Sequence, residues 1–303
     1  MKEYTLIVEE DYENDRVDRY VRSVLADFSR SYIQKLIENH ELTINDEPVR
    51  SSCRVKTGDV IHLVTSEQIP DILPQDIPLD ILYEDEDILI INKPKDMVVH
   101  PAPGHYDNTV VNAVMFHCKD LSGINGVLRP GIVHRIDKDT TGSLVICKND
   151  FAHEKIASQL KEHTIKREYI AIVTGVINEA GGTVDKPLGR SKTNRLKMAV
   201  DPDGKRAVTH YEVISRSDKF TLIRCRLETG RTHQIRVHMA YIGHPVAGDP
   251  IYGNGRKTPV DTRGQTLHAE ILGLVHPRTG EYIEVKAPLP DYFRKFADTF
   301  EKV

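Results

Sequence analysis

Residues 131–147, Gly-Ile-Val-His-Arg-Ile-Asp-Lys-Asp-Thr-Thr-Gly-Ser-Leu-Val-Ile-Cys, set a charged cluster between two apolar runs. The run before the cluster predicts a short buried segment, and the run after it predicts a strand. Charged side chains buried among aliphatic residues cost roughly several kcal/mol each unless they are paired, so partners are expected. The alternative is an ordinary turn, in which Asp137 or Asp139 caps backbone amides and Gly142 adopts a positive φ.

The composition limits the class of protein. With 303 residues and 39% hydrophobic content, the chain can bury a sizeable core in one or two domains. It has no long apolar run and no charged-then-apolar leader, so neither a membrane span nor a secretory signal is predicted. The four cysteines are scattered without a CxxC pair, which indicates a reducing cytosol, no disulfide partner and no zinc site. His233 and His238 lie five residues apart and cannot share a helix face as a metalloprotease pair would, so no metal is expected.

Charge and proline content divide the chain into two units. Residues 70–80 contain three prolines, which prevent regular structure and predict a linker between a domain at 1–69 and a domain at 81–303. Residues 67–90 hold eight acidic residues and no basic one, whereas the body that follows is net positive. A basic body is compatible with a polyanionic partner, although an ordinary solvated surface would give the same totals.

The first unit is predicted to be a small α/β domain. Apolar spacing indicates a helix over residues 16–26 and a second helix from an N-cap at Ser29 through Ile37. Residues 42–45 and 60–64 read as short strands.

This order, together with Arg16-Val-Asp-Arg and Lys56-Thr-Gly-Asp, resembles the S4 RNA-binding domain. The resemblance implies that the second helix contacts RNA through Arg30 and Lys35. The alternative is that both side chains are exposed residues that only keep the helix soluble.

The second unit is predicted to be α+β with a largely antiparallel sheet, because many non-sequential strands alternate with few helices. The alternation of residues 166–173 places Tyr169, Ala171 and Val173 on one face of a strand. A helix is expected from Arg231 or Thr232 to a residue before Gly243. The remaining expected elements are strands at 81–83, 88–92, 207–215, 220–227 and 281–286 and a helix at 151–162, capped by Asn149 or Asp150.

Three motifs occur in order along this unit: His134-Arg-Ile-Asp137, Lys166-Arg-Glu-Tyr169 and Glu228-Thr-Gly-Arg231-Thr-His-Gln, the last continuing to Gly248-Asp249. With Asn92-Lys93-Pro94 they resemble the RluA family of pseudouridine synthases. With the S4-like unit in front, the layout is similar to that of RluD-type members, which modify large-subunit ribosomal RNA. The resemblance implies the pseudouridine-synthase fold, a mixed and largely antiparallel sheet with flanking helices and loops.

The implied reaction isomerises uridine to its C-glycoside. The N1–C1′ bond breaks, the freed uracil rotates, and a bond forms at C5. No electrons are exchanged and no group enters, so no cofactor is expected. The reaction needs one carboxylate near C1′ or C2′, a dry cavity that retains uracil, and support for developing charge.

The resemblance assigns Asp137 as the nucleophile or base, and both attack at C1′ and proton removal from C2′ remain open. Desolvation raises a carboxyl pKa above its usual value of about 3.9, and a cation restores the ionised form. The resemblance gives that part to Arg231, which could instead be a surface arginine at a helix start. The resemblance also implies that Tyr169 stacks on the target base, although a tyrosine on a sheet face is often only part of the hydrophobic core.

A uridine inside folded RNA must leave the stack before it can react, at a cost of roughly a few kcal/mol. By resemblance, Arg135 fills the vacated place with its planar guanidinium, and the alternative is a salt bridge to Asp139. Basic stretches at 186–195, 205–206 and 256–257 are candidates for phosphate binding, or simply solvated loops.

The sequence therefore predicts a cytoplasmic RNA pseudouridine synthase that modifies large-subunit (23S) ribosomal RNA. We expect it to act as a monomer, although no residue pattern fixes the oligomeric state. A noncatalytic RNA-binding or ribosome-assembly factor is the alternative from another class. A glycoside hydrolase would need a second carboxylate as general acid, and no second motif supplies one.

Overall fold

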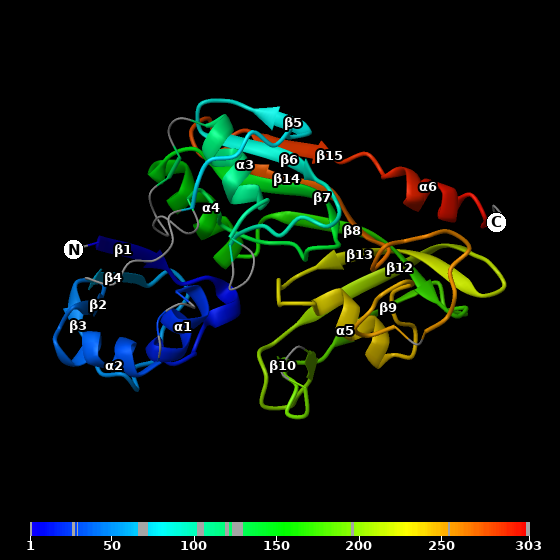
Figure 1. Cartoon of the computed structure of the whole chain (residues 1–303). Coiled ribbons are helices and arrows are strands. Elements are labelled where there is room, and N and C mark those ends of the chain that lie inside the picture. The colour runs from blue at the N-terminus through cyan, green and yellow to red at the C-terminus, as the bar shows by residue number, and fades with distance from the viewer. Residues whose placement is uncertain are drawn as a thin grey trace.

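The computed structural model describes residues 2–25, 28, 30–65, 72–101, 106–118, 121–122, 130–194, 197–253 and 255–300. Two main sheets organise these residues (Figure 1): a four-stranded sheet in the first 65 residues and a nine-stranded sheet in the rest. The predicted α+β class is confirmed, with the larger sheet mixed and mostly antiparallel.

The N-terminal unit, residues 2–65, folds as a twisted sheet covered by two helices. Its sheet order is β1-β4-β2-β3 and all its pairs are antiparallel. The predicted helices and central strands are confirmed, whereas β1 was not predicted, and the expected N-cap Ser29 lies outside the described residues. The elements are β1 (Lys2–Ile7), the 3-10 turn η1 (Glu10–Tyr12), α1 (Val17–Val24), α2 (Arg30–Glu38), β2 (Leu42–Ile44), β3 (Glu47–Pro48) and β4 (Val60–Thr65).

The large sheet has the order β5-β6-β7-β14-β8-β13-β12-β9, and β15 pairs with the free half of β14. Among the strand pairs described, only β7 and β14 run parallel. Its strands are β5 (Ile81–Glu84), β6 (Ile88–Lys93), β7 (Thr141–Cys147), β8 (Lys166–Thr174), β9 (Gly181–Asp185), β12 (Val208–Arg216), β13 (Phe220–Leu227), β14 (Leu267–Val275) and β15 (Tyr282–Lys286). A separate ribbon pairs β10 (Leu188–Arg190) with β11 (Met198–Val200).

In the described part of this unit, four helices flank the sheet: α3 (Val110–His117), α4 (Asp150–Lys161), α5 (Gln234–Tyr241) and α6 (Asp291–Ala297). Asn149 caps α4 by accepting a hydrogen bond from the Ala152 amide, as predicted. No helix in the described ranges is long and apolar enough to cross a bilayer. Neither α3 nor α6 was predicted.

Strand β8 lies in the middle of the sheet, between β14 and β13, and is buried on both faces. Tyr169, Ala171 and Val173 belong to one buried cluster and Ile170 and Ile172 to another, so the predicted alternation is confirmed. The motif tyrosine therefore stands on a rigid element, and its position is set by the sheet.

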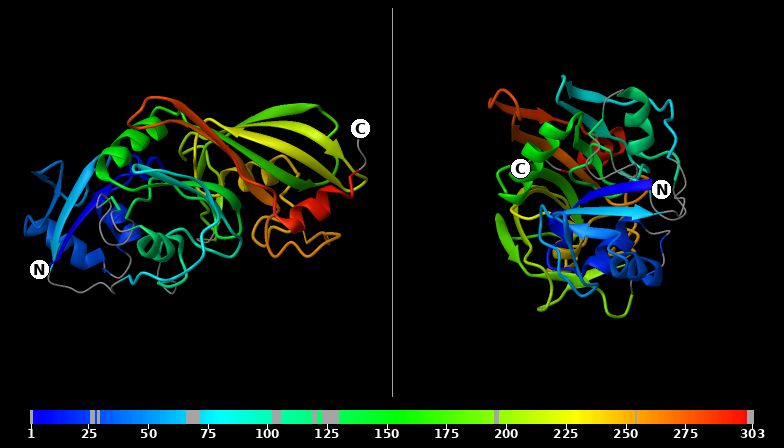
Figure 2. Two further views of the ribbon diagram at one scale, coloured as in Figure 1. Left: turned by 90° about the horizontal axis from the view of Figure 1, so that it is seen from above. Right: turned by 90° about the vertical axis from the view of Figure 1, so that its left-hand side faces the viewer.

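The N-terminal unit packs against the C-terminal unit, here the described residues 81–300. Figure 2 shows the N-terminal unit in blue at one end of the large sheet and α6 in red at the other. One buried hydrophobic cluster contains side chains of both units, including Val8 and Ile61 on one side and Ile136 and Ile146 on the other. This packing brings the segment after β1 next to the His134–Asp137 loop.

Candidate active site

The loop that carries Asp137 is held to the sheet by the residues around it. The Val145 amide donates a hydrogen bond to His134 Nε2 at 3.1 Å. Burial lowers the pKa of His134 to about 3, so the ring stays neutral and can accept this bond. Gly142 has a φ of 112°, and a Cβ there would lie 2.3 Å from the Ala269 carbonyl oxygen. The positive φ of Gly142, which was expected for the turn alternative, is therefore confirmed, and no other residue fits at this crossing of β7 and β14.

Lys93, from the Asn-Lys-Pro motif, braces the same loop from behind. Its ammonium is fully buried and donates to the carbonyl oxygens of Pro94 (2.7 Å), Met97 (2.8 Å) and Lys138 (2.9 Å). Burial lowers its pKa to about 7, against the field of Asp137. Because Lys138 follows Asp137 directly, this contact fixes the backbone next to the motif carboxylate.

Asp137 lines a cavity of about 440 Å³, and its side chain is 17% exposed. Arg236 Nη1 donates to Asp137 Oδ2 at 2.8 Å, and His233 Nε2 lies 3.9 Å from Oδ1. Burial acts to raise the pKa of Asp137, but His233 and Arg236 outweigh it and hold the pKa below its usual range. The carboxylate is therefore ionised in a largely desolvated site.

The predicted pair between Arg231 and Asp137 is wrong, because Arg236 occupies that place. Helix α5 begins at Gln234, after His233 with a φ of 58°, and not at residue 231 or 232. Arg236 is thus in the first turn of the helix, is buried, and faces the carboxylate. The sequence did contain a signal for Arg236, because it is the second arginine of the motif that begins at Glu228.

Arg231 lies in the turn before α5 and points toward the N-terminal unit. It donates through Nε to the Arg206 carbonyl at 3.0 Å and through Nη1 to the Glu10 carbonyl at 2.7 Å. Its Nη2 is 3.1 Å from Glu10 Oε1, an ion pair between the two units. Arg231 still lines the cavity, so it remains close to Asp137 without touching it.

Tyr169 and Arg135 both line the cavity that Asp137 lines. Tyr169 is 8% exposed and lines the cavity with Asp137, and burial raises the pKa of its hydroxyl, so it stays a neutral phenol. Arg135 is exposed and lines the same cavity. Within the residues described, it makes no ion pair with Asp139, whose charge instead acts on the pKa of Lys93 and Lys95.

The segment Glu9–Asp11 of the N-terminal unit forms one wall of the cavity. Thr232 Oγ1 donates to Asp11 Oδ2 at 2.9 Å, and Lys205 donates to the Asp11 carbonyl. Burial raises the pKa of Asp11 to about 6, although Thr232 and Arg231 act against it. Asp11 Oδ1 is buried with no hydrogen-bond partner among the described residues.

The RNA-binding residues predicted on α2 lie outside this cavity. Arg30 pairs with Asp18, with Nε–Oδ2 and Nη2–Oδ2 distances of 2.9 Å, and keeps 45% of its side chain exposed. Lys35 is exposed on the same helix. The structure therefore keeps both side chains at the surface of the N-terminal unit, away from Asp137.

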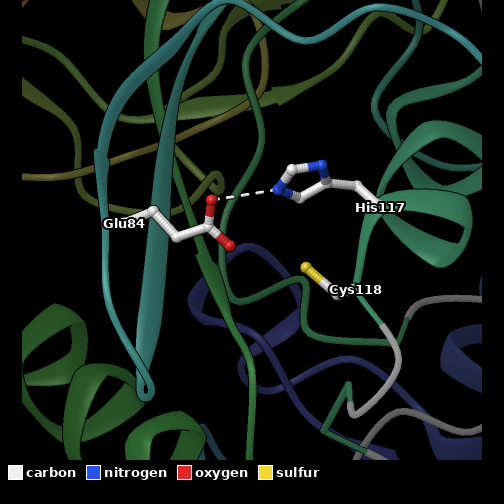
Figure 3. Close-up of side chains that lie close together, drawn as sticks. All are labelled: Glu84, His117 and Cys118. Carbon is white, nitrogen blue, oxygen red and sulfur yellow. Dashed lines mark hydrogen bonds and ion pairs between the residues drawn. The ribbon is translucent and has the colours of Figure 1, made fainter.

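Two groups of potential metal ligands occur in the described ranges, and neither lines the cavity. Figure 3 shows the first, in which His117 Nε2 faces a Glu84 oxygen at 3.0 Å with the Cys118 thiol nearby. The Lys148 ammonium also lies 2.9 Å from Glu84, so a metal ion would have to displace an existing cation. The second group, Asp85, Asp87 and His276, is held in hydrogen bonds of its own, including two from Arg278 to Asp87.

The cavity, its ionised carboxylate and the ordered motifs agree with the comparison to known proteins. The model of the RNA pseudouridylate synthase family matches residues 87–241, more than half of the chain. The chain belongs to this family. The enzyme class predicted from the three motifs, an isomerase that forms pseudouridine in RNA, is confirmed.

Relatives cover nearly the whole chain. An uncharacterized RNA pseudouridine synthase of Bacillus subtilis, YlyB, is 49% identical over 303 residues, covering 100% of this chain and 99% of that protein. The ribosomal large subunit pseudouridine synthase D of Zymomonas mobilis is 46% identical over 287 residues, covering 91% and 90%. The protein of that name in Vibrio vulnificus is 43% identical over 315 residues, covering 99% and 95%.

A solved structure supports the fold. Human RNA pseudouridylate synthase domain containing 1 aligns with a TM-score of 0.57 and 27% identity, covering 70% of this chain and 84% of that one.

Proposed function

We propose that this synthase isomerises specific uridines of large-subunit (23S) ribosomal RNA, with Asp137 as the catalytic carboxylate. The substrate class is supported by relatives named ribosomal large subunit pseudouridine synthase D at 43–46% identity. The observation that carries the catalytic role is the contact between Asp137 and Arg236 at the wall of a cavity of about 440 Å³. That volume is in the usual range for a site that encloses a small ligand.

The chemistry begins with Asp137 in its ionised form. It either attacks C1′ or removes the proton from C2′, and in both cases the N1–C1′ bond breaks and uracil leaves as an anion. Buried walls retain the freed base while it rotates. C5 then bonds to C1′ as the bond between Asp137 and C1′ breaks or, on the other route, as the proton returns to C2′, and the C5 proton is lost while N1 gains one. Tyr169 stands beside Asp137 and stacks on the base, and its neutral hydroxyl is suited to donate or relay a proton.

The target base enters the cavity by leaving the RNA stack. Arg135 follows His134 in the motif, lines the cavity and projects into solvent, so its guanidinium is placed to fill the vacated position. A loop or bulge in the RNA lowers the cost of this step, because its bases are already partly unstacked.

The N-terminal unit, an S4-like domain at 1–69 tethered by a linker at 70–80, adds RNA affinity to the catalytic domain at 81–303. A tethered module acts at a high effective concentration, so even weak contacts through Arg30 and Lys35 raise overall binding. RNA phosphates compete with Glu10 for Arg231, so part of the contact between the units opens when RNA binds. In this proposal the enzyme acts as a monomer in the cytoplasm, where its ribosomal substrate is made.

The proposal is tested with Asp137→Asn, which keeps the shape of the side chain and removes its charge. Pseudouridine formation in large-subunit ribosomal RNA, read by carbodiimide primer extension, should fall below detection while the protein stays folded. Asp96→Asn is the matched control, because Asp96 is exposed and pairs only with Lys138 among the described contacts. Full activity in folded Asp137→Asn would remove the central assignment.

A further inference from the structure

Asp249 is a buried carboxylate that no step of the reaction uses directly. Its side chain is 0% exposed, and it faces Arg236, whose side chain is 3% exposed. Asp249 Oδ2 accepts from Arg236 Nε at 2.7 Å, and Oδ1 accepts from Arg236 Nη2 at 2.9 Å. This two-point contact occupies one edge of the guanidinium and leaves Nη1 for Asp137.

The turn that carries Asp249 is itself fixed. Asp249 Oδ1 also accepts from the amides of Ile251 (2.8 Å) and Tyr252 (3.0 Å). Gly248 before it has a φ of 73°, and a Cβ there would lie 2.1 Å from Thr262 Oγ1. The carboxylate therefore has its position set by backbone contacts before any RNA arrives.

The same turn supports the second group that faces Asp137. The Arg236 guanidinium lies over the Tyr252 ring at 5.1 Å from its centroid. The Tyr252 hydroxyl is 2.8 Å from His233 Nδ1, and the other ring nitrogen of His233 faces Asp137 at 3.9 Å. Residues 249–252 thus hold both Arg236 and His233 against the catalytic carboxylate.

We propose that Asp249 is a positioning residue, which holds the Arg236 guanidinium so that a single nitrogen meets Asp137. An arginine with no second partner could rotate and chelate Asp137 with two nitrogens, and would tie up both carboxylate oxygens. With Asp249 in place, two carboxylates share one guanidinium, so the three groups carry a net negative charge. Asp137 then keeps an oxygen and negative charge free toward the sugar, where positive charge develops as the N1–C1′ bond breaks.

This inference rests on the proposed role of Asp137, so its test compares both residues. Steady-state kcat and KM would be measured on one RNA fragment for Asp249→Asn, Arg236→Gln, their double variant and Asp137→Asn. Asp261→Asn is the matched control, because it makes the same chemical change at a carboxylate that is 80% exposed. Thermal unfolding and near-UV circular dichroism establish that each variant is folded.

We expect Asp249→Asn to lower kcat about 10- to 100-fold, the effect of a misplaced catalytic group, with KM changed less than about threefold. The double variant should be within about twofold of Arg236→Gln alone, because Asp249 acts only through Arg236. If Asp249 had a merely structural role, the loss of kcat in the double variant would instead be the product of the losses in the two single variants. Asp261→Asn should stay within about twofold of the unaltered enzyme.

Asp249→Glu extends the test if Asp249→Asn does not fold, because it keeps the charge and shifts the carboxylate by one methylene. It should lower kcat about three- to tenfold, again with no further loss when combined with Arg236→Gln. Unchanged kcat in a folded Asp249 variant, or multiplicative losses in the double variant, would overturn the inference. Activity in Asp137→Asn would instead show that the role proposed for Asp137 had failed.

Discussion

Two aspartates line the same cavity and differ in the direction in which their pKa is shifted. Asp137, in the C-terminal unit, has Arg236 at 2.8 Å and His233 at 3.9 Å, and these two groups hold its pKa below the usual range against the effect of burial. Asp11, in the N-terminal unit, accepts a hydrogen bond from the Thr232 hydroxyl, and burial raises its pKa to about 6. Loss of water alone therefore makes a carboxyl weakly acidic, and a fixed cation in contact makes it a carboxylate.

Removing the Arg236 guanidinium should raise the pKa of Asp137 toward that of Asp11, and after Asp137→Asn itself this is the largest effect we expect. Arg236→Gln should lower kcat about 100- to 1,000-fold. Because the pKa of Asp137 then rises, its protonated fraction grows at low pH, and the acid side of the pH–rate profile should move to higher pH. The unaltered enzyme should lose no activity to protonation of Asp137 between about pH 5 and 7.

Arg231→Gln, compared with Arg236→Gln, distinguishes the roles of the two arginines. Since Arg231 contacts Glu10 and not Asp137, its replacement should change kcat less than about tenfold and act mainly on the KM for RNA. If the pH–rate profile shifted with Arg231→Gln and did not shift with Arg236→Gln, Arg231 would be the partner of Asp137, as first predicted.

Replacing Glu10 should weaken the contact between the two units and change the KM for RNA. Glu10→Gln removes the carboxylate that pairs with Arg231, so RNA phosphates should gain access to Arg231 more easily. We expect the KM for RNA to fall about two- to fivefold at unchanged kcat. Glu38→Gln, an exposed change on α2 of the same unit, is the control and should leave KM unaltered. An increase in KM for Glu10→Gln would mean that this contact helps RNA binding.

The smallest effect concerns pH and the packing of the N-terminal unit. A carboxyl whose folded pKa is raised stabilises the folded arrangement when protonated, so this contribution is lost as pH rises from about 4 through about 6. The packed arrangement should therefore be more populated at pH 5 than at pH 7.5, with a smaller radius of gyration by X-ray scattering. Asp11→Asn, which is always neutral, should abolish this dependence, and persistence of the dependence in that variant would exclude Asp11 as its source.

Local patterns predicted much of the fold. Helices α1 and α4 and the faces of β8 follow from spacing and capping residues that act within a few positions. Among the elements that were not predicted, β14 and α3 show why such a signal can be missing. Strand β14 is buried on both faces, so its sequence does not alternate, and α3 is apolar nearly all round, which removes the helical period.

The sequence predicted which residues line the site, but it did not predict which arginine pairs with Asp137. Asp137, Tyr169 and Arg135 were found from motifs, and each lines the cavity. The choice between Arg231 and Arg236 depended on where α5 begins, a difference of two or three residues that turns each side chain to another neighbour. The wall formed by Glu9–Asp11 depends on packing between units far apart in the sequence, which no local pattern encodes.

The most direct measurement is a crystal structure of Asp137→Asn bound to an RNA fragment that contains a uridine mapped as a target. We predict that the target C1′ lies within about 3.5 Å of the residue 137 side chain, with Arg236 still in contact and the Arg135 guanidinium in the place of the flipped base. A target sugar outside the cavity, or one that lies against Asp11 and away from residue 137, would contradict it.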